Sequence, residues 1–451
     1  MMLFTTKWLA SIFTNNRGEG TLPLLEVTTD SRKKCKNSLF VPLVGEKFDA
    51  HDYAEQAFEN GAVAFLWNEN NPLPDHLPDH FPVFFVKDTL KALQELAWHY
   101  RNKVNPIVIG ITGSNGKTTT KDLTTSIVSS SYVTHFTKGN LNNHIGLPLT
   151  ILSMPANTEV LIVEMGMSDF GEIELLTSIA RPKYAMITNI GESHIEYLGS
   201  REGIAKAKKE IVKELPDDGV VIIDGDEPLL YDLKQSYRTE TCGFNATNSN
   251  VIRKVQITEK GTQFQFCDET FHVPLLGEHH AKNASFAIEI GKLLCIPFDK
   301  IKKSLESLTQ TGMRFELLKG TDGETIINDA YNASPTSMKA AIEVVKQMTG
   351  YREKVLVLGD ILELGAKSAA FHKSVAEVIE PPITAVYTYG KNAKFITDEV
   401  QKKHPNMQFK HFTEKEALLH ELKKHKNESS LLLFKASRGL KFELLIEKLI
   451  D

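Results

Sequence analysis

The segment that most constrains the fold runs from Pro106 to Asp122. An apolar run, Ile107 to Ile111, leads into Gly-Ser-Asn-Gly-Lys-Thr at positions 113–118 and then into a helix-compatible stretch. A strand, a glycine loop and a helix in this order are typical of a phosphate-binding loop. Glycines let backbone N–H groups close around phosphate oxygens, and the start of the helix adds partial positive charge. The segment therefore predicts a nucleotide site.

Side chains of this loop are expected to contact the nucleotide. Lys117 can neutralise the β and γ phosphates, and the Thr118 hydroxyl can bind Mg²⁺. Ile111 stands where the strict GxxxxGK[ST] string has its first glycine, so the loop is a shortened form. The alternative is a chance turn, against which the flanking strand and helix argue. The predicted cofactor-binding residues of the loop are Gly113, Ser114, Asn115, Gly116, Lys117, Thr118 and Thr119.

Length and composition restrict the class of protein. A chain of 451 residues is too long for one ordinary core and predicts two to four domains. A net charge of −5 gives no reason to expect a nucleic-acid partner, and no stretch approaches the roughly 18 apolar residues of a membrane span. The four scattered cysteines lack a CxxC pair, which indicates a cytoplasmic protein. The first 13 residues predict a short amphipathic helix rather than a signal peptide.

The pattern of strands and helices divides the chain into three α/β regions. Residues 1–104 predict a small domain that ends in a helix after Asp88, a plausible N-cap. Residues 105–311 predict a central P-loop ATPase-like domain built on a parallel sheet. Residues 312–451 predict a Rossmann-like domain, which has no GxGxxG string and therefore no assigned dinucleotide. The predicted fold class is α/β with three domains.

Two polar side chains follow strands of the central region. Glu164 follows the run 160–163, and His194 comes shortly after the run 184–190. The carboxyl ends of parallel strands share one edge of the sheet, so both side chains are expected near the phosphate-binding loop. A carboxylate there can complete a Mg²⁺ site with Thr118. Lys208 lies fourteen residues after His194 in an alanine-rich helix, where a lysine by itself indicates only a solvated face.

These motifs resemble those of the Mur ligases, which build peptidoglycan precursors, and of the related folylpolyglutamate synthetases. The resemblance rests on the strings LNNHIG, EMGM, NIGESH, DAYNASP and LGDILELG, and it extends from Ser31 to Arg438. It implies an ATP-dependent amide ligase that activates a carboxylate as an acyl phosphate. A monomer is expected, although no motif reports the oligomeric state. The implied cofactors are ATP and two Mg²⁺ ions. The implied substrates are UDP-N-acetylmuramoyl-tripeptide and D-alanyl-D-alanine, the latter held by the C-terminal domain.

The resemblance also implies roles for individual residues. Lys208 is expected to be carbamylated and to bind a second Mg²⁺ with His194, and Lys206 is the rival position. A carbamate is an anionic group that forms on a neutral amine. Asn283 is expected to contact the adenine, and Arg314 and Asp329 are expected to contact the phosphates and the ribose. The implied catalytic residues are Lys117, His194, Lys208 and Arg314, and the implied metal ligands are Thr118, Glu164, His194 and Lys208.

Substrate contacts are expected in three places. The resemblance implies that the N-terminal domain binds the UDP-sugar, where Arg32 can pair with the diphosphate and Ser31 can add hydrogen bonds. The amide-rich loop 137–150 suits a peptide backbone, because asparagines both donate and accept. The predicted substrate-binding residues are Ser31, Arg32, Asn140, Asn142, Asn143, Tyr331 and Asn332.

Two alternatives remain open at this point. One is a different Mur-type or folylpolyglutamate-type amino acid ligase. The other is a non-enzymatic P-loop switch protein, against which Glu164, His194 and Lys208 argue because a switch needs no second metal site. The third residue of the tripeptide stays open as well.

Overall fold

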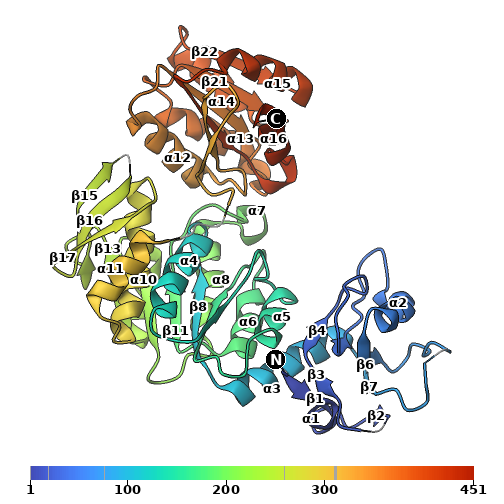
Figure 1. Ribbon diagram of the computed structural model, residues 1–451. Coiled ribbons are helices and arrows are strands. Elements are labelled where there is room, and N and C mark those ends of the chain that lie inside the picture. Colours follow the sequence, from blue (N-terminus) through green and yellow to red (C-terminus); the bar gives the residue numbers. More distant parts are fainter. Residues whose placement is uncertain (1, 19, 76, 259, 309–311, 451) are drawn as a thin grey trace.

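A computed structural model describes residues 2–18, 20–75, 77–258, 260–308 and 312–450. It contains three α/β domains, which confirms the predicted fold class (Figure 1). The central domain has the N-terminal domain beside it and the C-terminal domain above it in this view. The predicted boundary at residue 311 falls outside the described residues. Within the described chain, no helix is long and apolar enough to cross a membrane.

The N-terminal domain is built on a five-stranded sheet with the order β2-β7-β6-β5-β4. All neighbouring strands are parallel except β2 and β7. The predicted opening helix is the short α1, in which Leu9 is fully buried. The elements are β1 (Phe4–Thr5), α1 (Thr6–Ala10), β2 (Asn16–Arg17), β3 (Pro23–Leu24), β4 (Glu26–Thr28), β5 (Ser38–Phe40), α2 (Ala54–Glu59), β6 (Ala62–Asn68) and β7 (Val83–Val86).

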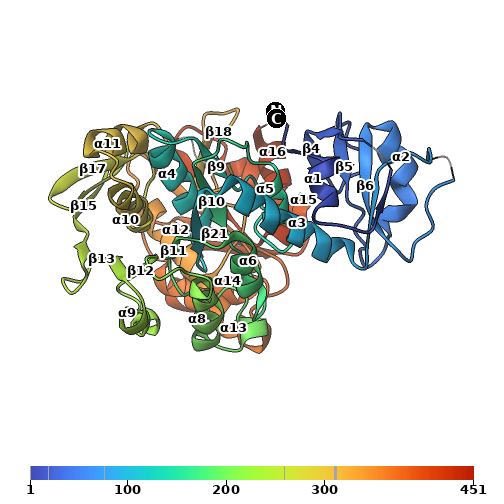
Figure 2. The ribbon, with the colours of Figure 1, turned by 90° about the horizontal axis from the view of Figure 1, so that it is seen from below.

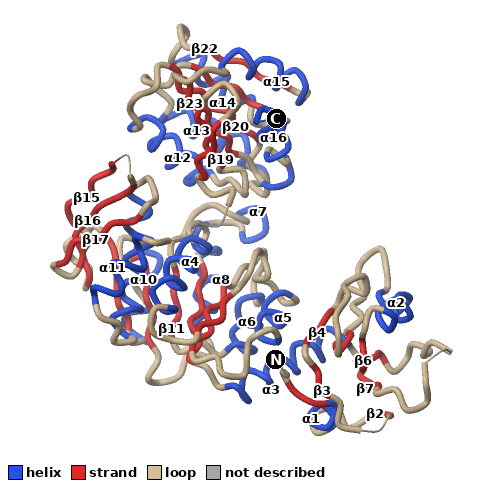
Figure 3. Tube along the Cα trace, in the orientation of Figure 1, coloured by secondary structure: helices blue, strands red, loops and turns tan. Residues whose placement is uncertain are grey.

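Helix α3 (Thr89–Val104) joins the first domain to the second. The Asp88 side chain accepts from the backbone N–H groups of Leu90 and Lys91, which confirms the predicted N-cap. The helix packs against α5 (Gly146–Leu152) and α6 (Glu172–Ala180) of the central domain (Figure 3). Its buried Tyr100 hydroxyl donates to the Met154 carbonyl at 2.9 Å. The end of the first region is therefore also part of a domain contact.

The central domain contains seven parallel strands in the order β14-β13-β12-β11-β8-β10-β9. Strand β8 lies between β10 and β11, so the loops that follow these three strands meet at one edge. An antiparallel sheet of β15, β16 and β17, which the sequence analysis did not predict, extends this domain. The strands are β8 (Ile107–Thr112), β9 (Thr134–Phe136), β10 (Val160–Glu164), β11 (Tyr184–Ile187), β12 (Val220–Asp224), β13 (Thr239–Gly243), β14 (Asn250–Val251), β15 (Arg253–Thr258), β16 (Gly261–Phe266) and β17 (Glu269–Val273).

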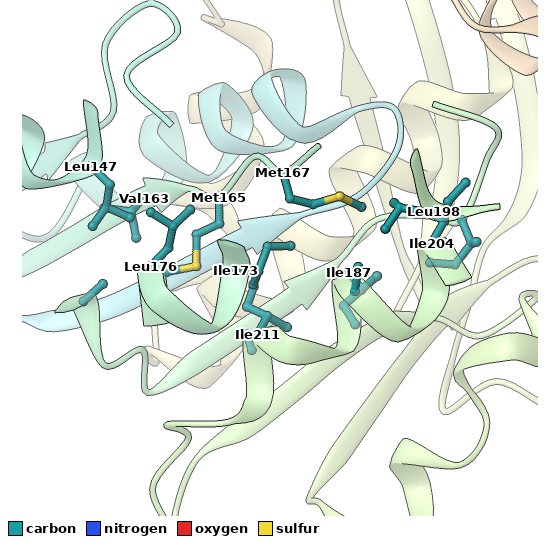
Figure 4. Packing of buried hydrophobic residues seen from close by; sticks show 14 of the residues in the cluster. Leu147, Val163, Met165, Met167, Ile173, Leu176, Ile187, Leu198, Ile204 and Ile211 are labelled. Carbon is teal, nitrogen blue, oxygen red and sulfur yellow. The ribbon is translucent and has the colours of Figure 1, made fainter. Parts of the chain in front are cut away.

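Helices cover both faces of the central sheet (Figure 2). The first face packs against α4 (Lys117–Ser129), α10 (Glu278–Leu293) and α11 (Phe298–Glu306). The second face packs against α5, α6 and α8 (Arg201–Lys209), and α7 (Ile195–Leu198) and α9 (Leu233–Ser236) are shorter. On this second face, Ile204 of α8 lies in the apolar layer with Ile187 of β11 (Figure 4). Residues four apart share a helix face, so Lys208 is directed to the same side as Ile204.

The C-terminal sheet has the strand order β18-β19-β23-β20-β21-β22, and all pairs are parallel except β18 with β19. Helices α12, α13 and α14 cover one face and α15 and α16 the other, as in a Rossmann-like domain. The elements are β18 (Glu316–Lys319), β19 (Thr325–Asn328), α12 (Pro335–Gln347), β20 (Glu353–Gly359), α13 (Ser368–Val375), β21 (Ala385–Tyr389), α14 (Lys394–Lys403), β22 (Gln408–Phe412), α15 (Lys415–Leu422), β23 (Ser430–Lys435) and α16 (Glu443–Ile450).

Candidate active site

Two glycines give the phosphate-binding loop its shape. Gly113 and Gly116 have φ angles of 151° and 78°, which side chains of L-residues rarely adopt. A Cβ atom on Gly113 would lie 1.9 Å from Thr188 Oγ1, and one on Gly116 would lie 2.5 Å from Asn283 Oδ1. Both positions therefore require glycine, and Asn283 of α10 lies directly against the loop.

The loop is fixed to the segment that follows β11. Thr188 Oγ1 donates to the Asn115 carbonyl at 2.7 Å, and the Asn115 N–H donates to Asn189 Oδ1 at 2.9 Å. The N–H of Gly191 donates to Ser114 Oγ at 2.8 Å. These bonds hold the loop in a fixed conformation, as a preorganised anion site requires.

Lys117 is the first residue of α4, and its Nζ donates to the Gly113 carbonyl across the loop at 2.8 Å. Burial lowers the pKa of Lys117, the negative charge of Glu164 raises it, and the positive charge of Arg314 lowers it. The amine therefore lies inside the loop among other charged groups, where it can bind a phosphate.

Thr118 is the centre of a polar cluster at the sheet edge. Its Oγ1 donates to Glu164 Oε2 at 2.8 Å, and Arg314 Nη2 donates to the same Oγ1 at 2.8 Å. Asn142 Nδ2 donates to the other carboxylate oxygen of Glu164 at 2.8 Å. The guanidinium of Arg314 lies 4.1 Å from the centre of the Tyr331 ring. The structure thus brings Thr118, Glu164, Asn142, Arg314 and Tyr331 together from two domains.

The structure distinguishes Lys208 from its rival, Lys206. Lys208 is only 2% exposed, whereas Lys206 is exposed with its Nζ 5.5 Å from the centre of the Phe170 ring. Burial lowers the pKa of Lys208 well below its usual value, and the charge of Lys117 lowers it further. Among the described residues no carboxylate pairs with the Lys208 amine. An amine of this kind is neutral far more readily than an exposed lysine.

His194 lies between the central and the C-terminal domains. It precedes α7, and its Nδ1 is 2.5 Å from Oε2 of Glu363. Helix α7 faces the C-terminal domain (Figure 1). Three or more His, Cys, Asp or Glu side chains arranged to hold a metal are not found in the part of the chain that the structure describes.

Further residues of the C-terminal domain contact the loop region. Ser334 Oγ donates to Asn115 Oδ1 at 3.1 Å, and Thr336 Oγ1 donates to Glu192 Oε2 at 2.8 Å. The predicted nucleotide residue Asp329 has its Oδ2 2.5 Å from Lys435 Nζ. Asp329 also accepts from the N–H of Phe315, which follows Arg314. Asp329 therefore helps to hold the segment that directs Arg314 to Thr118.

His280, which was not among the predicted site residues, lies on the same helix as Asn283 and lines a cavity. His280 is 5% exposed, and within the described chain neither ring nitrogen has a hydrogen-bond partner. Burial lowers the pKa of His280 well below its usual value, which favours the neutral ring. The cavity has a volume of about 190 Å³ and is lined by Pro274, Leu275, Leu276, His280, Phe315 and Leu317.

Several predicted substrate residues have other partners here. The guanidinium of Arg32 pairs with Asp30 at 2.8 Å, and Ser31 Oγ donates to Gln56 Oε1 at 2.7 Å. Asn143 Oδ1 accepts from the Gly146 N–H at the start of α5. Asn140 and Asn332 are exposed and Thr119 is buried in α4. Ser31 and Arg32 lie in the N-terminal domain, whereas Arg314 brings the C-terminal domain to the loop itself.

A three-domain α/β chain with a phosphate-binding loop, a threonine–carboxylate pair and an arginine from a second domain is a nucleotide-binding protein of the P-loop class. More narrowly, the chain belongs to the Mur ligase family. Residues 25–101 match the model described as "Mur ligase family, catalytic domain", and residues 111–291 match "Mur ligase middle domain". Residues 313–438 match "Mur ligase, glutamate ligase domain". These matches confirm the predicted family.

Whole-chain relatives agree with the family models. The chain is 49% identical to the UDP-N-acetylmuramoyl-tripeptide–D-alanyl-D-alanine ligase of Bacillus subtilis, over 94% of this chain and 93% of that one. It is 35% identical to the Escherichia coli protein of the same name, over 100% and 99%. A crystal structure of MurF from Acinetobacter baumannii superposes with a TM-score of 0.88 at 28% identity, over 99% and 98%. MurF from Thermotoga maritima, in complex with ADP, gives 0.82 at 27%, over 94% and 96%.

Proposed function

We propose that the chain is an ATP-dependent, ADP-forming ligase that joins D-alanyl-D-alanine to UDP-N-acetylmuramoyl-tripeptide. The observation that carries the proposal is the 49% identity over 94% of the chain to a relative of that name. The cluster of Lys117, Thr118, Glu164 and Arg314 supplies the charges that phosphoryl transfer needs.

ATP binding is supported by the loop and by its surroundings. The phosphates would lie against the backbone N–H groups of residues 113–118 and near Lys117. Asn283 packs against Gly116. The cavity beside His280 offers apolar walls and ring nitrogens that have no hydrogen-bond partner among the described residues. A purine base needs such surroundings, because its faces are apolar and its edge forms hydrogen bonds.

The residues at the sheet edge fit Mg²⁺. This ion is usually held by one or two carboxylates together with substrate phosphates, so one carboxylate and one hydroxyl suffice from the protein. Glu164 at the end of β10 and Thr118 at the start of α4, whose side-chain oxygens are 2.8 Å apart, would hold it. The bound ion would neutralise charge on the phosphates. Asn142 orients the Glu164 carboxylate through its second oxygen.

A second ion would be held by His194 and by a carbamate on Lys208. The amine of Lys208 is buried and has no ion-pair partner among the described residues, which fits carbamate formation, because only a neutral amine reacts with carbon dioxide. The reaction joins the nitrogen to carbon dioxide and releases one proton. It converts a costly buried amine into an anion that a nearby cation stabilises.

The mechanism uses the chain to position charges. The terminal carboxylate of the tripeptide attacks the γ-phosphorus of ATP, which gives an acyl phosphate and ADP. The dipeptide amine, after loss of a proton, attacks the acyl carbon, and inorganic phosphate leaves from the tetrahedral intermediate. Lys117 and Arg314 stabilise the charge on the transferred phosphoryl group. Arg314 belongs to the C-terminal domain, so docking of this domain completes the charge pattern.

The chain would contact the UDP-sugar and the dipeptide through residues of all three domains. Ser31 and Arg32 would bind the UDP end once Arg32 exchanges Asp30 for a diphosphate, and Asn140, Asn143, Tyr331 and Asn332 would contact the dipeptide or shape its site. We also propose that the enzyme acts as a monomer in the cytoplasm. The four cysteines are free thiols in the described chain, as expected in a reducing compartment.

Phosphate release from ATP tests the proposal. We expect release that requires both UDP-N-acetylmuramoyl-tripeptide and D-alanyl-D-alanine. Single D-alanine, L-lysine and glutamate serve as matched amine controls. Faster release with glutamate than with the dipeptide would overturn the proposed acceptor, and release that needs no amine would overturn the ligase assignment.

A further inference from the structure

Glu363 and His194 come from different domains, and each has an unusual backbone conformation. Their φ angles are 61° and 64°, in the left-handed region that residues other than glycine rarely adopt. Such conformations persist where the surrounding structure holds them, and they cluster at functional sites. Here the two residues contact each other, with Nδ1 and Oε2 2.5 Å apart.

The C-terminal domain holds the loop of Glu363 firmly. The Asp360 carboxylate accepts from the backbone N–H groups of residues 391, 392 and 393 at 2.6–2.8 Å. The N–H of Ile361 donates to His372 Nε2 at 3.0 Å, and the N–H of Leu362 donates to Ser437 Oγ at 2.9 Å. The position of Glu363 is therefore fixed by its own domain.

A backbone contact at the same place joins the two domains. The N–H of Glu196 in α7 donates to the Glu363 carbonyl at 3.2 Å. A Cβ atom on Gly365 would lie 3.4–3.5 Å from atoms of Glu196, so the two segments are in van der Waals contact. The His194 contact thus belongs to a docked surface and not to a single chance pair of side chains.

The chemistry of the pair determines which imidazole nitrogen is available. An ionised carboxylate only accepts hydrogen bonds, so Nδ1 carries the proton when it lies beside Glu363. The Nδ1 atom is buried, and within the described chain its 2.5 Å contact with Glu363 lacks the angle of a full hydrogen bond, which a rotation of the ring would supply. With the proton on Nδ1, the neutral ring has its lone pair on Nε2. Histidines that bind metals generally donate their other N–H to a carboxylate, which fixes the tautomer and the ring orientation.

We propose that Glu363 is a positioning residue for His194, so that docking of the C-terminal domain sets the histidine tautomer that the metal site needs. This inference rests on the proposed function in one respect, the assignment of His194 as a metal ligand. The central domain alone would leave the ring free to rotate and to change tautomer. The C-terminal domain, which brings Arg314 to Thr118, therefore also sets the tautomer of His194.

Nitrogen NMR of the ligand-free, histidine-labelled protein tests the contact directly at a pH where imidazole is neutral. His194→Gln identifies the signal. We expect the Nδ1–H tautomer in the wild type and in Glu363→Gln, because the glutamine amide oxygen can still accept. Glu363→Ala should shift the population toward Nε2–H.

Thr336→Val, which removes the contact with Glu192 at the same boundary, is the matched control and should retain the wild-type tautomer. An unchanged tautomer in Glu363→Ala would overturn the proposal.

Manganese binding in the presence of ADP tests the consequence. Loss of such a supporting carboxylate typically weakens metal affinity by about 10- to 100-fold, so we expect this loss in Glu363→Ala, a smaller loss in Glu363→Gln and none in Thr336→Val. Tighter binding in Glu363→Ala would mean that Glu363 withholds His194 from the metal, which contradicts a positioning role. The NMR result needs no metal and no substrate. A wild type with the expected tautomer but without ligase activity would therefore disprove only the proposed function.

Discussion

The central domain makes two different kinds of contact with its neighbours. The N-terminal domain is joined through α3, whose buried face, with Leu96 and Tyr100, packs in one apolar cluster with Leu147 and Ile151 of α5. The C-terminal domain contacts the edge of the central sheet at the phosphate-binding loop, called the phosphate edge below. It does so with polar side chains, among them Arg314, which donates to Thr118. The first contact can hold the N-terminal domain in place. The second brings a charged side chain to the phosphate-binding loop.

The difference between an apolar and a polar domain contact predicts that one mainly affects stability and the other mainly affects catalysis. An apolar contact resists separation whether or not a ligand is present, because burial of apolar surface drives it. A contact made of hydrogen bonds and charges contributes little net stability, but it changes the local charge when it forms. Substitutions at the phosphate edge should therefore affect turnover, and substitutions along α3 should affect unfolding.

The largest effect is expected for Lys117→Ala. This substitution removes a half-buried amine from the phosphate-binding loop. We expect kcat to fall by about a thousandfold, the upper range for loss of one electrostatic group at a reacting centre. Steady-state kinetics measure the fall, and calorimetry checks that the protein remains folded. Lys402→Ala, on an exposed face of α14, is the control. A folded Lys117→Ala variant with more than about a tenth of wild-type kcat, a loss under roughly 1.4 kcal/mol, contradicts the assignment.

A slightly smaller effect is expected for Lys208→Ala. If the carbamate holds a second ion, this variant should lose about a hundredfold in activity, and added acetate should restore part of it. Restoration should depend on the Mg²⁺ concentration, because acetate would replace a metal ligand. The exposed Lys206 gives the matched control, since Lys206→Ala should change stability by at most about 0.5 kcal/mol and activity hardly at all. Full activity in Lys208→Ala, or loss confined to Lys206→Ala, would disprove the placement.

Periodicity and motif order predicted the fold more completely than the site. Strand β8 and the glycine loop were readable because the residues involved are neighbours in sequence. The antiparallel sheet β15–β17 was not predicted, although its strands alternate more and less buried residues, as is typical of half-buried strands. The burial of Lys208 and the exposure of Lys206 follow from the side of α8 that packs on the sheet.

Contacts between domains could not be predicted from the sequence. Glu363 is separated from His194 by more than a hundred residues, and no local pattern reports that docking brings them together. Arg314 was assigned through resemblance, but its contact with Thr118 is visible only in three dimensions. His280 was not predicted as a site residue, because a pair of histidines at the start of a helix is equally typical of a polar cap. The structure shows His280 beside a cavity instead.

In the N-terminal domain, Arg32→Ala is expected to have a moderate effect that is selective for one substrate. Arg32 is exposed and holds Asp30, whose pKa it lowers to about 2. If Arg32 binds the diphosphate, its loss should raise KM for the nucleotide-sugar by about tenfold, the value of one charged hydrogen bond. KM for ATP and for the dipeptide should remain near the wild-type values, and initial-rate kinetics with each substrate varied measures all three. Lys33→Ala, at the neighbouring exposed position, is the control. Equal changes in all three constants would indicate a structural role.

The smallest effect on activity is expected for Tyr100→Phe in α3. Tyr100 is fully buried, and its hydroxyl donates to the Met154 carbonyl at 2.9 Å. Removal of the hydroxyl leaves a buried carbonyl without this partner, so the free energy of unfolding should fall by about 1–2 kcal/mol. Denaturant titration measures this loss, and Tyr231→Phe, with Tyr231 40% exposed, should lose almost nothing. Because α3 transmits no charge to the phosphate edge, kcat should stay within about twofold of the wild type. A large fall in kcat with unchanged stability would mean that the α3 contact takes part in the chemistry, and the distinction between the two domain contacts would then fail.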